Sequence, residues 1–288
     1  MSKQKSFALQ GAFGAFSHQA AMRFFDQLQS SNGEKSGDAQ YISCQNFAEI
    51  FEKVSSGDAA YGVIPLENSS IGSIVANYDL LWTSNAYIVE EIFIPVSHNL
   101  IGFEGAAIDQ ITNVYSHPAA LDQCRQLFKR NKQMKAQVHW DTSGSVLFVK
   151  ESGNKSWAAI ASSMAADEHG MHILETGVED FTHNATRFGL VVGCEDPKNM
   201  EKPKAPYKIS CAAEVEHKPG SLANLLWGLS QHGANLTKIE SRPIAETPWH
   251  YRFFMDILVD NAAKDDKILA AMSKNSSKHK LLGRYKPA

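Results

Sequence analysis

The chain has 288 residues, of which 43% are hydrophobic and 10% aromatic, a composition that is ordinary for a globular protein and argues against disorder. This length exceeds what one compact core usually holds, so two or three domains are expected. The 28 basic and 31 acidic residues give a net charge of −3 without a long basic run, which argues against nucleic-acid and membrane partners. We therefore expect small molecules or copies of the same chain as partners.

The sequence shows no sign of a targeting segment, a disulfide framework or a metal site. The apolar run Phe7–Leu9 is too short for a signal peptide, and no apolar stretch approaches the length of a membrane span. His169 and His172 lack further ligands nearby, so we expect no metal and no cofactor. The cysteines contain no C-x-x-C pair, which favours free thiols in a reducing cytoplasm: Cys44, Cys124, Cys194 and Cys211.

The N-terminal part alternates short apolar strands with helical patterns. Strands are predicted at 7–9, 41–44 and 59–64, the last closed by Pro65, helices at 17–28 and 47–54, and a loop at 30–38. Such alternation is typical of an α/β fold with a parallel sheet.

A second α/β pattern follows Tyr87. Strands are predicted at 87–96, 99–102, 114–116, 138–140 and 186–192, and helices at 118–129, from a cap at 141–143 to 151, and at 159–168. Two such units within one region predict a cleft between two lobes.

The stretch Glu195–Pro206 holds three prolines and six charges, and it is interpreted as a domain linker. Beyond it, strands are predicted at 207–214, 235–244, 250–259 and 280–285, with helices at 220–232 and 262–274. Gly233 is placed to end the first of these helices. The order βαββαβ is the ferredoxin-like arrangement.

Polar residues gather where predicted strands end, which is where ligands bind in α/β sheets. The glycine turn Gly11–Ser17 precedes a helix and favours an anion, although an ordinary tight turn explains it equally. Asn68 and Ser69 offer uncharged donors, or cap a helix. Ser116 and Gln123 are seven residues apart, so helical pitch can bring both side chains to one wall.

Two further candidates are weaker when taken alone. His117 stands beside a helix-starting proline and is interpreted as a capping or packing residue rather than a general base. Thr186, Arg187 and Phe188 follow Asn184 at the start of a late strand, and such a tripeptide is common.

Six segments follow one another along the chain: the glycine turn, PLENS at 65–69, SHPAALDQC at 116–124, DTSGS at 141–145, AAIAS at 158–162 and NATRF at 184–188. In this order, they resemble the prephenate dehydratase family. The resemblance spans nearly the whole chain. It implies a catalytic region over residues 1–195, similar to a two-lobed periplasmic binding protein with the substrate between its lobes.

The resemblance also implies roles for single residues. Thr186 is expected to be catalytic, because it belongs to the family's T-R-F motif. The expected substrate-binding residues are Asn68, Ser69, Ser116, Gln123, Thr142, Ser143, Arg187 and Phe188. Ala15 departs from the family pattern, where a threonine is frequent.

After a linker at 196–206, residues 207–288 resemble an ACT domain that binds phenylalanine. Pro219–Leu222 stands where the family usually has G-A-L, with Ser221 in place of alanine, and Glu240–Pro243 matches E-S-R-P. The expected phenylalanine-binding residues are Gly220, Ser221, Leu222, Ala223, Asn235, Leu236, Glu240 and Ser241.

The implied activity is the decarboxylating dehydration of prephenate to phenylpyruvate, with L-phenylalanine as effector of a cytoplasmic homodimer or homotetramer. Because decarboxylation supplies the electrons, no base is needed, and Thr186 would donate a hydrogen bond to the leaving hydroxyl. Arg187 or backbone N–H groups near Gly11–Ser17 would hold the pyruvyl carboxylate; alternatively, Arg187 forms a structural ion pair. The competing interpretations are an arogenate dehydratase and a non-catalytic amino-acid sensor.

Overall fold

A computed structural model describes residues 5–32, 38–244 and 246–288. The chain forms two compact units. Unit 1 comprises Met1–Ile50, Val63–Gly72 and Phe93–Phe188, and unit 2 comprises Phe51–Gly62, Ser73–Ile92 and Gly189–Ala288. Most of the loop predicted at 30–38 lies outside the described residues, and its first three residues belong to helix α1.

Unit 1 contains two sheets, the first of which is built around the N-terminal strand. Its order is β11-β3-β1-β2, and β1 and β2 run parallel from the pair Lys5↔Ala39 to Gln10↔Cys44. Phe7, Ala8 and Leu9 of β1 and Phe24 of α1 are fully buried, as expected for a parallel strand that is covered on both faces. The elements of this part of the chain are β1 (Lys5–Gln10), α1 (Phe16–Asn32), β2 (Ala39–Cys44), α2 (Phe47–Ser56), β3 (Tyr61–Asn68), β4 (Gly72–Ser73) and β11 (Ala185–Gly193). Of these, α2, β3, β4 and β11 also contain residues that belong to unit 2.

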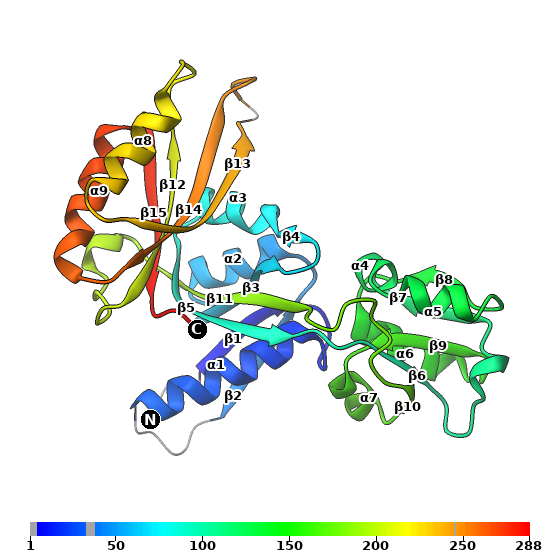
Figure 1. Ribbon diagram of the computed structural model, residues 1–288. Helices are drawn as coiled ribbons and strands as arrows, with labels where there is room; N and C mark the ends of the chain where they lie inside the picture. Colours follow the sequence, from blue (N-terminus) through cyan, green and yellow to red (C-terminus); the bar gives the residue numbers. More distant parts are fainter. Residues whose placement is uncertain (1–4, 33–37, 245) are drawn as a thin grey trace. The chain divides into compact units, whose positions relative to one another are not determined.

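The second sheet of unit 1 has the order β10-β6-β9-β7-β8 and is covered on both faces (Figure 1). Ile160 of β9 packs with Leu121 and Leu127, whereas its neighbour Ala159 packs with Val146 on the other face. The strands are β6 (Asn99–Gly102), β7 (Asn113–Ser116), β8 (Lys135–Val138), β9 (Trp157–Ala161) and β10 (His172–Glu175). The helices are α4 (Pro118–Asp122), α5 (Arg125–Arg130), α6 (Thr142–Ser152) and α7 (Ser163–His169).

Four local predictions were wrong. The strand predicted at 138–140 lies earlier, at β8 (Lys135–Val138). The predicted helix 159–168 is strand β9 followed by α7, because Ala158–Ala161 is a fully buried central strand and Ser162 caps the helix behind it. The predicted helix 118–129 is broken into α4 and α5. Pro65 does not close its strand, since β3 continues to Asn68. Strand β10 was not predicted.

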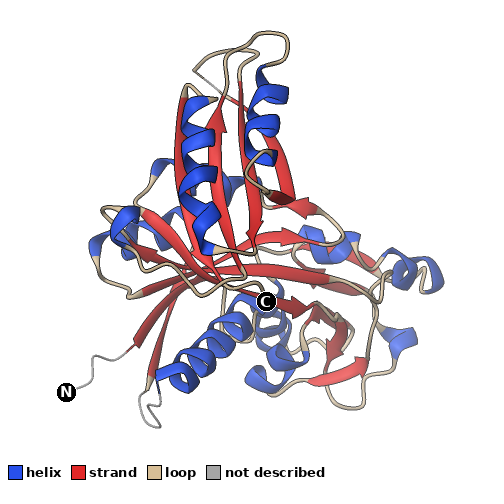
Figure 2. Ribbon diagram, turned by 60° about the vertical axis from the view of Figure 1, so that its left-hand side comes forward, coloured by secondary structure: helices blue, strands red, loops and turns tan. Residues whose placement is uncertain are grey.

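Unit 2 contains the predicted βαββαβ arrangement. Its antiparallel sheet has the order β13-β14-β12-β15, and β15 pairs in parallel with β5 at Gly283↔Ile88. Helices α8 and α9 cover one face (Figures 1 and 2), where Leu225 and Ile268 pack against Ile209 and Met255. The elements are β5 (Ala86–Pro95), β12 (Tyr207–Glu214), α8 (Ser221–Ser230), β13 (Asn235–Pro243), β14 (Tyr251–Val259), α9 (Asp265–Lys274) and β15 (Lys278–Tyr285).

Helix α3 (Val75–Thr83) contacts the other face of this sheet. The ring of Tyr78 lies 5.3 Å from that of Phe254, whose neighbour Met255 points to α8 and α9. The Arg252 guanidinium lies over the Trp82 ring at 4.1 Å, a cation–π geometry. Unit 2 is therefore a three-layer arrangement of helices, sheet and helix.

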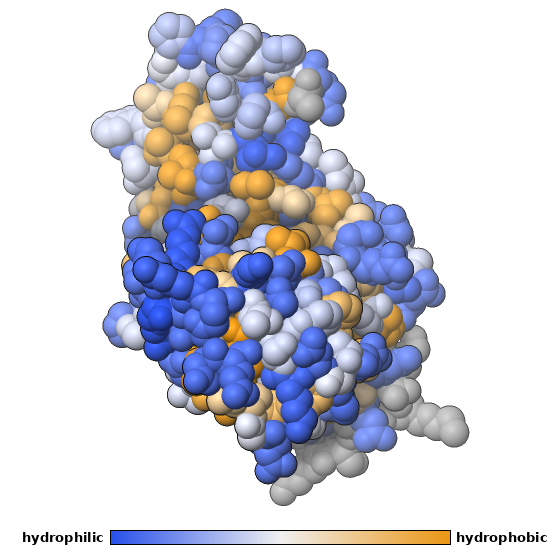
Figure 3. Space-filling model, turned by 90° about the vertical axis from the view of Figure 1, so that its right-hand side faces the viewer, coloured by the Kyte–Doolittle hydropathy of each residue, from blue (hydrophilic) through white to orange (hydrophobic). Residues whose placement is uncertain are grey.

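Within the predicted linker, the structure has one short 3-10 helix, Pro197–Asn199, before β12 begins at Tyr207. Among the described residues, no helix is long and apolar enough to cross a membrane. Figure 3 shows one face of the molecule, where hydrophilic side chains cover most of the surface and apolar side chains lie between them.

Candidate active site

The side chains of Asn68 and Thr186 meet at the ends of two neighbouring strands of unit 1. Asn68 is the last residue of β3, and Thr186 is the second residue of β11. The Asn68 Nδ2 atom donates to Thr186 Oγ1 at 3.0 Å, and the two residues are only 5% and 9% exposed. A threonine hydroxyl is thus held at a strand end and largely shielded from water.

Two more buried amides continue this contact. Asn68 Nδ2 also donates to Asn184 Oδ1 at 2.8 Å, and Asn184 Nδ2 donates to Gln123 Oε1 at 2.9 Å. His98 Nε2 lies 2.8 Å from the same Gln123 oxygen. The structure therefore joins Asn68, Gln123 and Thr186, as predicted residues, with Asn184 and His98, which were not predicted as site residues.

The break between α4 and α5 explains where the Gln123 side chain lies. Both Asp180 carboxylate oxygens accept the first backbone N–H groups of α5, from Arg125 at 3.1 Å and Gln126 at 2.9 Å. The Asp180 N–H donates to the Gln123 carbonyl at 2.6 Å. Asp180 acts as a cap from outside the local sequence, so it starts a new helix directly after Gln123.

Ser69 fixes the segment that carries Asn184. Its hydroxyl donates to the His183 carbonyl at 3.3 Å and accepts the Ala185 N–H at 3.0 Å. Beside this clamp lies a cavity of about 500 Å³, lined by Ser69, Ser70, Asp180, Phe181, Thr182 and His183. The cavity volume lies within the range of small-molecule sites.

The other predicted hydroxyls mostly contact backbone carbonyls. Ser116 Oγ is buried and donates to the Ile160 carbonyl at 2.6 Å. Ser143 Oγ donates to the Phe13 carbonyl. Thr142 is half-buried at the start of α6. The structure brings Ser143 to the glycine turn rather than to Thr186.

The glycine turn is itself held by the α6 and α7 starts. Ala12 N–H donates to Asp141 Oδ2 at 2.8 Å, and Ser162 Oγ donates to the Gly14 carbonyl at 2.7 Å. Gly14 has φ +86°, and a Cβ there would lie 2.8 Å from the Ala165 Cα, so only glycine fits. The Gly14 N–H donates to His18 Nδ1 at 3.0 Å. Because Ala12 and Gly14 use their N–H groups within the protein, the expectation that this turn's backbone holds a substrate carboxylate is not supported for these two groups.

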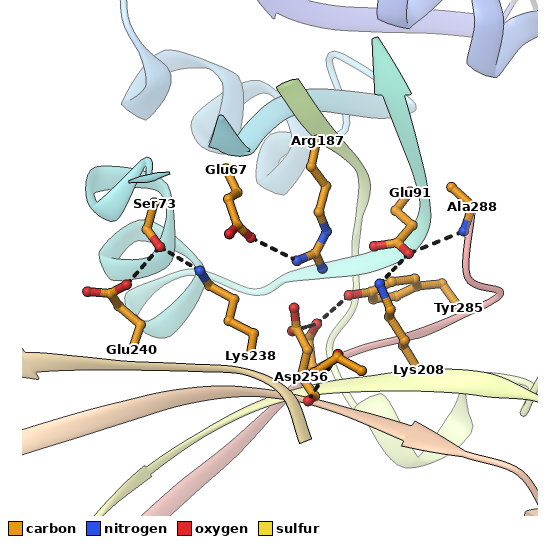
Figure 4. A network of polar contacts seen from close by, with 12 residues as sticks. Glu67, Ser73, Glu91, Arg187, Lys208, Lys238, Glu240, Asp256, Tyr285 and Ala288 are labelled. Atoms are coloured by element: carbon orange, nitrogen blue, oxygen red, sulfur yellow. Dashed lines mark hydrogen bonds and ion pairs between the residues drawn. The ribbon is translucent and has the colours of Figure 1, made fainter. Parts of the chain in front are cut away.

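Arg187 lies on the opposite side of its strand from Thr186. Consecutive strand residues alternate in direction, and Arg187 Nη1 pairs with Glu67 Oε2 at 3.5 Å (Figure 4). This placement favours the structural ion pair over substrate binding. Phe188 shares the face of Thr186 by the same alternation and is buried at 3% exposure.

Burial sets the charge state of the site's histidine. Desolvation lowers the pKa of His98 from its ordinary value, so the imidazole is neutral near neutral pH. His117 caps α4 by accepting the Ala119 N–H at 3.2 Å, as the sequence predicted. Among the described residues, no cluster of three or more His, Cys, Asp or Glu side chains could hold a metal ion. All four cysteines are free.

The predicted effector residues lie on two parts of unit 2. Gly220 caps α8 with φ +85°, and Ser221 and Leu222 line a cavity of about 360 Å³ together with Tyr251 and Phe253. Ala223 is exposed on α8, and Asn235 and Leu236 begin β13. Ser241 pairs with Phe253 across the sheet, which links β13 to that cavity.

Glu240 points to the start of α3 rather than to this cavity. Its Oε2 accepts from Ser73 Oγ at 2.8 Å, and Lys238 Nζ lies 2.5 Å from the same hydroxyl (Figure 4). Arg242 pairs with Asp79 of α3 at 2.9 Å. Within this chain, the charged residues of the E-S-R-P segment therefore hold the α3 region.

The family model and the relatives with known names point to the same protein family. The family model for prephenate dehydratase matches residues 7–195. A prephenate dehydratase of Methanocaldococcus jannaschii is 33% identical over 274 residues, which cover 94% of both chains. A chloroplastic arogenate dehydratase/prephenate dehydratase of Arabidopsis thaliana is 33% identical, and the match covers 96% of this chain and 68% of that protein.

Two solved structures resemble the chain over almost its full length. The prephenate dehydratase of Arthrobacter aurescens in complex with L-Phe has a TM-score of 0.85 and 26% identity, covering 98% of this chain and 90% of that one. GqqA, described as a novel type of quorum-quenching acylase, has a TM-score of 0.82 and 28% identity, covering 99% and 98%.

Proposed function

The chain belongs to the prephenate dehydratase family, and we propose that the buried hydroxyl of Thr186 assists the departure of the ring hydroxyl in the reaction of this family. The enzyme is a carbon–oxygen lyase that converts prephenate to phenylpyruvate. The bond to the ring carboxylate breaks and its electron pair enters the ring, while the opposite C–O bond breaks. The hydroxyl leaves as water after taking one proton, and carbon dioxide is released.

The observation that carries this proposal is the contact between Thr186 and Asn68. Thr186 Oγ1 accepts from Asn68 Nδ2 at 3.0 Å in a buried setting, which leaves the threonine proton for another acceptor. A hydroxyl donor is stronger in a shielded site than in water, and a positioned proton donor contributes about 10²–10⁴-fold to a rate. The net reaction takes up one proton, so solvent must finally replace the proton that leaves with water.

We propose that Gln123 binds a substrate oxygen through its amide nitrogen, with Ser69, Ser116, Thr142, Ser143 and Phe188 forming the surroundings. Asn68 would serve the substrate through Thr186, because its two amide hydrogens already go to Asn184 and Thr186. Ser69, Ser116 and Ser143 already donate to backbone carbonyls, so they would act by shaping the site or by accepting hydrogen bonds. Arg187 is left out, because its ion pair with Glu67 is on the other face of the strand.

For regulation, we propose that residues 207–288 form an ACT domain, joined through a linker at 196–206 to a catalytic region of residues 1–195. L-phenylalanine would bind near Gly220, Ser221, Leu222 and Ala223, with Asn235, Leu236 and Ser241 from β13 completing the site. Glu240 is left out of this site, because its carboxylate accepts from Ser73 beside α3. The cavity beside Ser221 and Leu222 and the L-Phe complex of the Arthrobacter aurescens relative support this assignment. A homodimer or homotetramer in the cytoplasm is the expected setting.

Arogenate dehydration is the alternative activity, because a relative of similar identity carries both names. The side chain of arogenate bears an amine where prephenate has a ketone, so the ring chemistry at Thr186 would be unchanged. A non-catalytic sensor would not need the Thr186 hydroxyl in its buried amide setting.

The contacts in this site are less suited to the reaction of an acylase. Amide hydrolysis needs a nucleophile activated by an adjacent base. Thr186 contacts an amide nitrogen instead, and Ser143, which lies 3.1 Å from His169 Nε2, donates its own proton to the Phe13 carbonyl. Among the described side chains, these contacts favour the lyase.

The test is to incubate the full chain separately with prephenate, arogenate and an N-acyl amide, and to follow phenylpyruvate, phenylalanine and free acid. Formation of phenylpyruvate, lowered by added L-phenylalanine, is expected. Preference for arogenate would support the alternative substrate, and release of free acid alone would overturn the lyase assignment.

A further inference from the structure

Five buried side chains of unit 1 form one continuous hydrogen-bond chain that ends at the Thr186 hydroxyl. It runs from His98 Nε2 to Gln123 Oε1 (2.8 Å), from Asn184 Nδ2 to the same oxygen (2.9 Å), and from Asn68 Nδ2 to Asn184 Oδ1 (2.8 Å) and Thr186 Oγ1 (3.0 Å). Each residue is at most 9% exposed. Water therefore has little access to replace any of these bonds.

The contacts of Asn68 fix which atoms donate and which accept along this hydrogen-bond chain. Asn68 Oδ1 accepts the backbone N–H groups of Ser70 at 2.9 Å and Ile71 at 3.1 Å. Backbone N–H groups can only donate, so the atom that faces them must be the amide oxygen, and the nitrogen must face Asn184 and Thr186. The orientation of Asn68 is thus independent of the usual ambiguity of amide groups.

The remaining orientations follow one after another. Because Asn68 donates to Asn184, the Asn184 atom at that contact is its oxygen, and its nitrogen must donate to Gln123. The Gln123 atom is then also an oxygen, so the ring nitrogen of His98 at 2.8 Å must carry a proton. A reversed Gln123 amide would place one donor against another.

We propose that His98 is a positioning residue for the dehydration: its Nε2–H is the terminal donor that, with Asn184, holds Gln123 Oε1 inward. The amide nitrogen of Gln123 then remains as a donor for the substrate, and the chain leaves Thr186 with its own proton to give. His98 touches neither reacting atom in this scheme and acts through Gln123. The inference rests on the proposed function and extends it by two residues, His98 and Asn184.

The surroundings of His98 fit a neutral ring with its proton on Nε2. Its Nδ1 atom is buried and has no hydrogen-bond partner among the described residues. The ring packs edge-on against Phe16 with centroids 5.7 Å apart. A proton on Nδ1 would therefore be buried without an acceptor, which is costly. Burial also lowers the pKa of this histidine, which keeps the ring neutral.

The experiment compares two substitutions of equal length. His98→Gln can keep an N–H near the position of Nε2. His98→Met introduces a side chain that is similar in shape to glutamine but has no donor. Steady-state turnover of prephenate and thermal unfolding are measured for both and for the wild type. His98→Met should lower kcat about 10- to 100-fold with a much smaller change in KM, since a small misplacement of a reacting group has effects of this size. His98→Gln should recover most of the loss.

Wild-type turnover separates this inference from the proposed function. If the wild type leaves prephenate unchanged, the function fails; if it is active and His98→Met matches its kcat, only the positioning role fails. Equal losses of kcat in both variants, with equal losses of thermal stability, would also overturn the role. Should both variants fail to fold, ¹⁵N NMR of histidine-labelled wild type still decides: a proton on Nε2 supports the chain, and one on Nδ1 contradicts it.

Discussion

Thr186 and Arg187 are consecutive residues of β11, yet their side chains have separate roles on opposite faces of the strand. Thr186 Oγ1 meets Asn68 Nδ2, whereas Arg187 Nη1 meets Glu67 Oε2, and Asn68 and Glu67 are themselves consecutive in β3. The pleat of two neighbouring strands thus puts a neutral pair on one face and a charged pair on the other. The Thr186 hydroxyl, which we propose to assist the reaction, is thereby kept apart from a strong charge.

Replacing Thr186 by Val removes the hydroxyl while keeping the shape of the side chain. We expect kcat to fall about 10²- to 10⁴-fold with little change in KM, because the lost interaction acts when the hydroxyl leaves. Thr186→Ser is the matched control, since it keeps an O–H group, and it should stay within about 10-fold of the wild type. Turnover of prephenate by Thr186→Val at the wild-type rate would exclude the proposed role.

Asn184→Asp changes one atom of the buried chain. The aspartate has no donor for Gln123 Oε1, so an oxygen would face an oxygen until Gln123 reverses and turns its oxygen toward the substrate. We expect kcat to fall about 10- to 100-fold, because two buried oxygens that face each other without a donor cost about 1–3 kcal/mol. Asn113→Asp is the same change at the start of β7, away from the hydrogen-bond chain, and it should leave kcat unchanged in the same assay. Equal effects of the two substitutions on kcat would contradict the proposed role of the hydrogen-bond chain.

The sequence was sufficient where a structural signal is local. Asp141 caps α6 at the predicted position, because a cap contacts residues only a few positions away. Helix α8 begins at Ser221, one residue after the predicted start. Short apolar stretches likewise identified β6 and β12 with their observed bounds. Asn68 and Gln123 were already candidates from their places near predicted strand ends, and Thr186 was singled out through the family resemblance.

What was missed depends on contacts between distant residues. The break after Gln123 is caused by Asp180, whose carboxylate caps a helix 54 and 55 positions away. His98 lies 25 positions before Gln123 in a loop between two strands, and nothing in its neighbourhood distinguishes it from a packing residue. Asn184 was visible only as the residue before Ala185 and Thr186. Such partners become apparent only when the strands are placed side by side.

Asp141→Ala should destabilise the protein through two lost contacts. Its carboxylate accepts the Gly144 N–H as the cap of α6 and the Ala12 N–H of the glycine turn. We expect the free energy of unfolding to fall by about 1–3 kcal/mol, measured by urea denaturation followed by circular dichroism. Asp141→Asn keeps an acceptor oxygen and should lose less. If Asp141→Ala unfolds at the wild-type urea concentration, these contacts do not stabilise the folded chain.

Gly220→Ala tests the loop proposed to bind the effector. With φ at +85° and open space around the Cα, alanine would be strained by its backbone conformation alone, at a cost of about 1–2 kcal/mol. Relaxation of this strain should shift the start of α8 and raise the phenylalanine concentration needed for half-maximal inhibition. Gly177→Ala, at φ +63° in unit 1 and equally open, is the control for strain alone. Inhibition curves that change equally in both variants would argue against a role for the loop.

The pH dependence of stability should be set in part by two histidines that accept backbone hydrogen bonds. His18 Nδ1 accepts the Gly14 N–H at 3.0 Å, and His117 Nδ1 accepts the Ala119 N–H at 3.2 Å. An accepting nitrogen must be unprotonated, and burial lowers the pKa of both residues from the ordinary value of 6.5.

Stability should fall on acidification, because the unfolded state then binds more protons than the folded state. In the unfolded chain these histidines take up protons near pH 6.5, whereas in the folded chain they do so only at lower pH, so acid favours unfolding. Their contribution is complete above about pH 6.5 and is lost as the pH falls toward the folded-state pKa. Urea midpoints measured from neutral pH to about pH 5 should therefore decrease. His18→Asn offers an amide oxygen that does not titrate in this range, so its midpoints should decrease less; midpoints that rise on acidification would contradict this account.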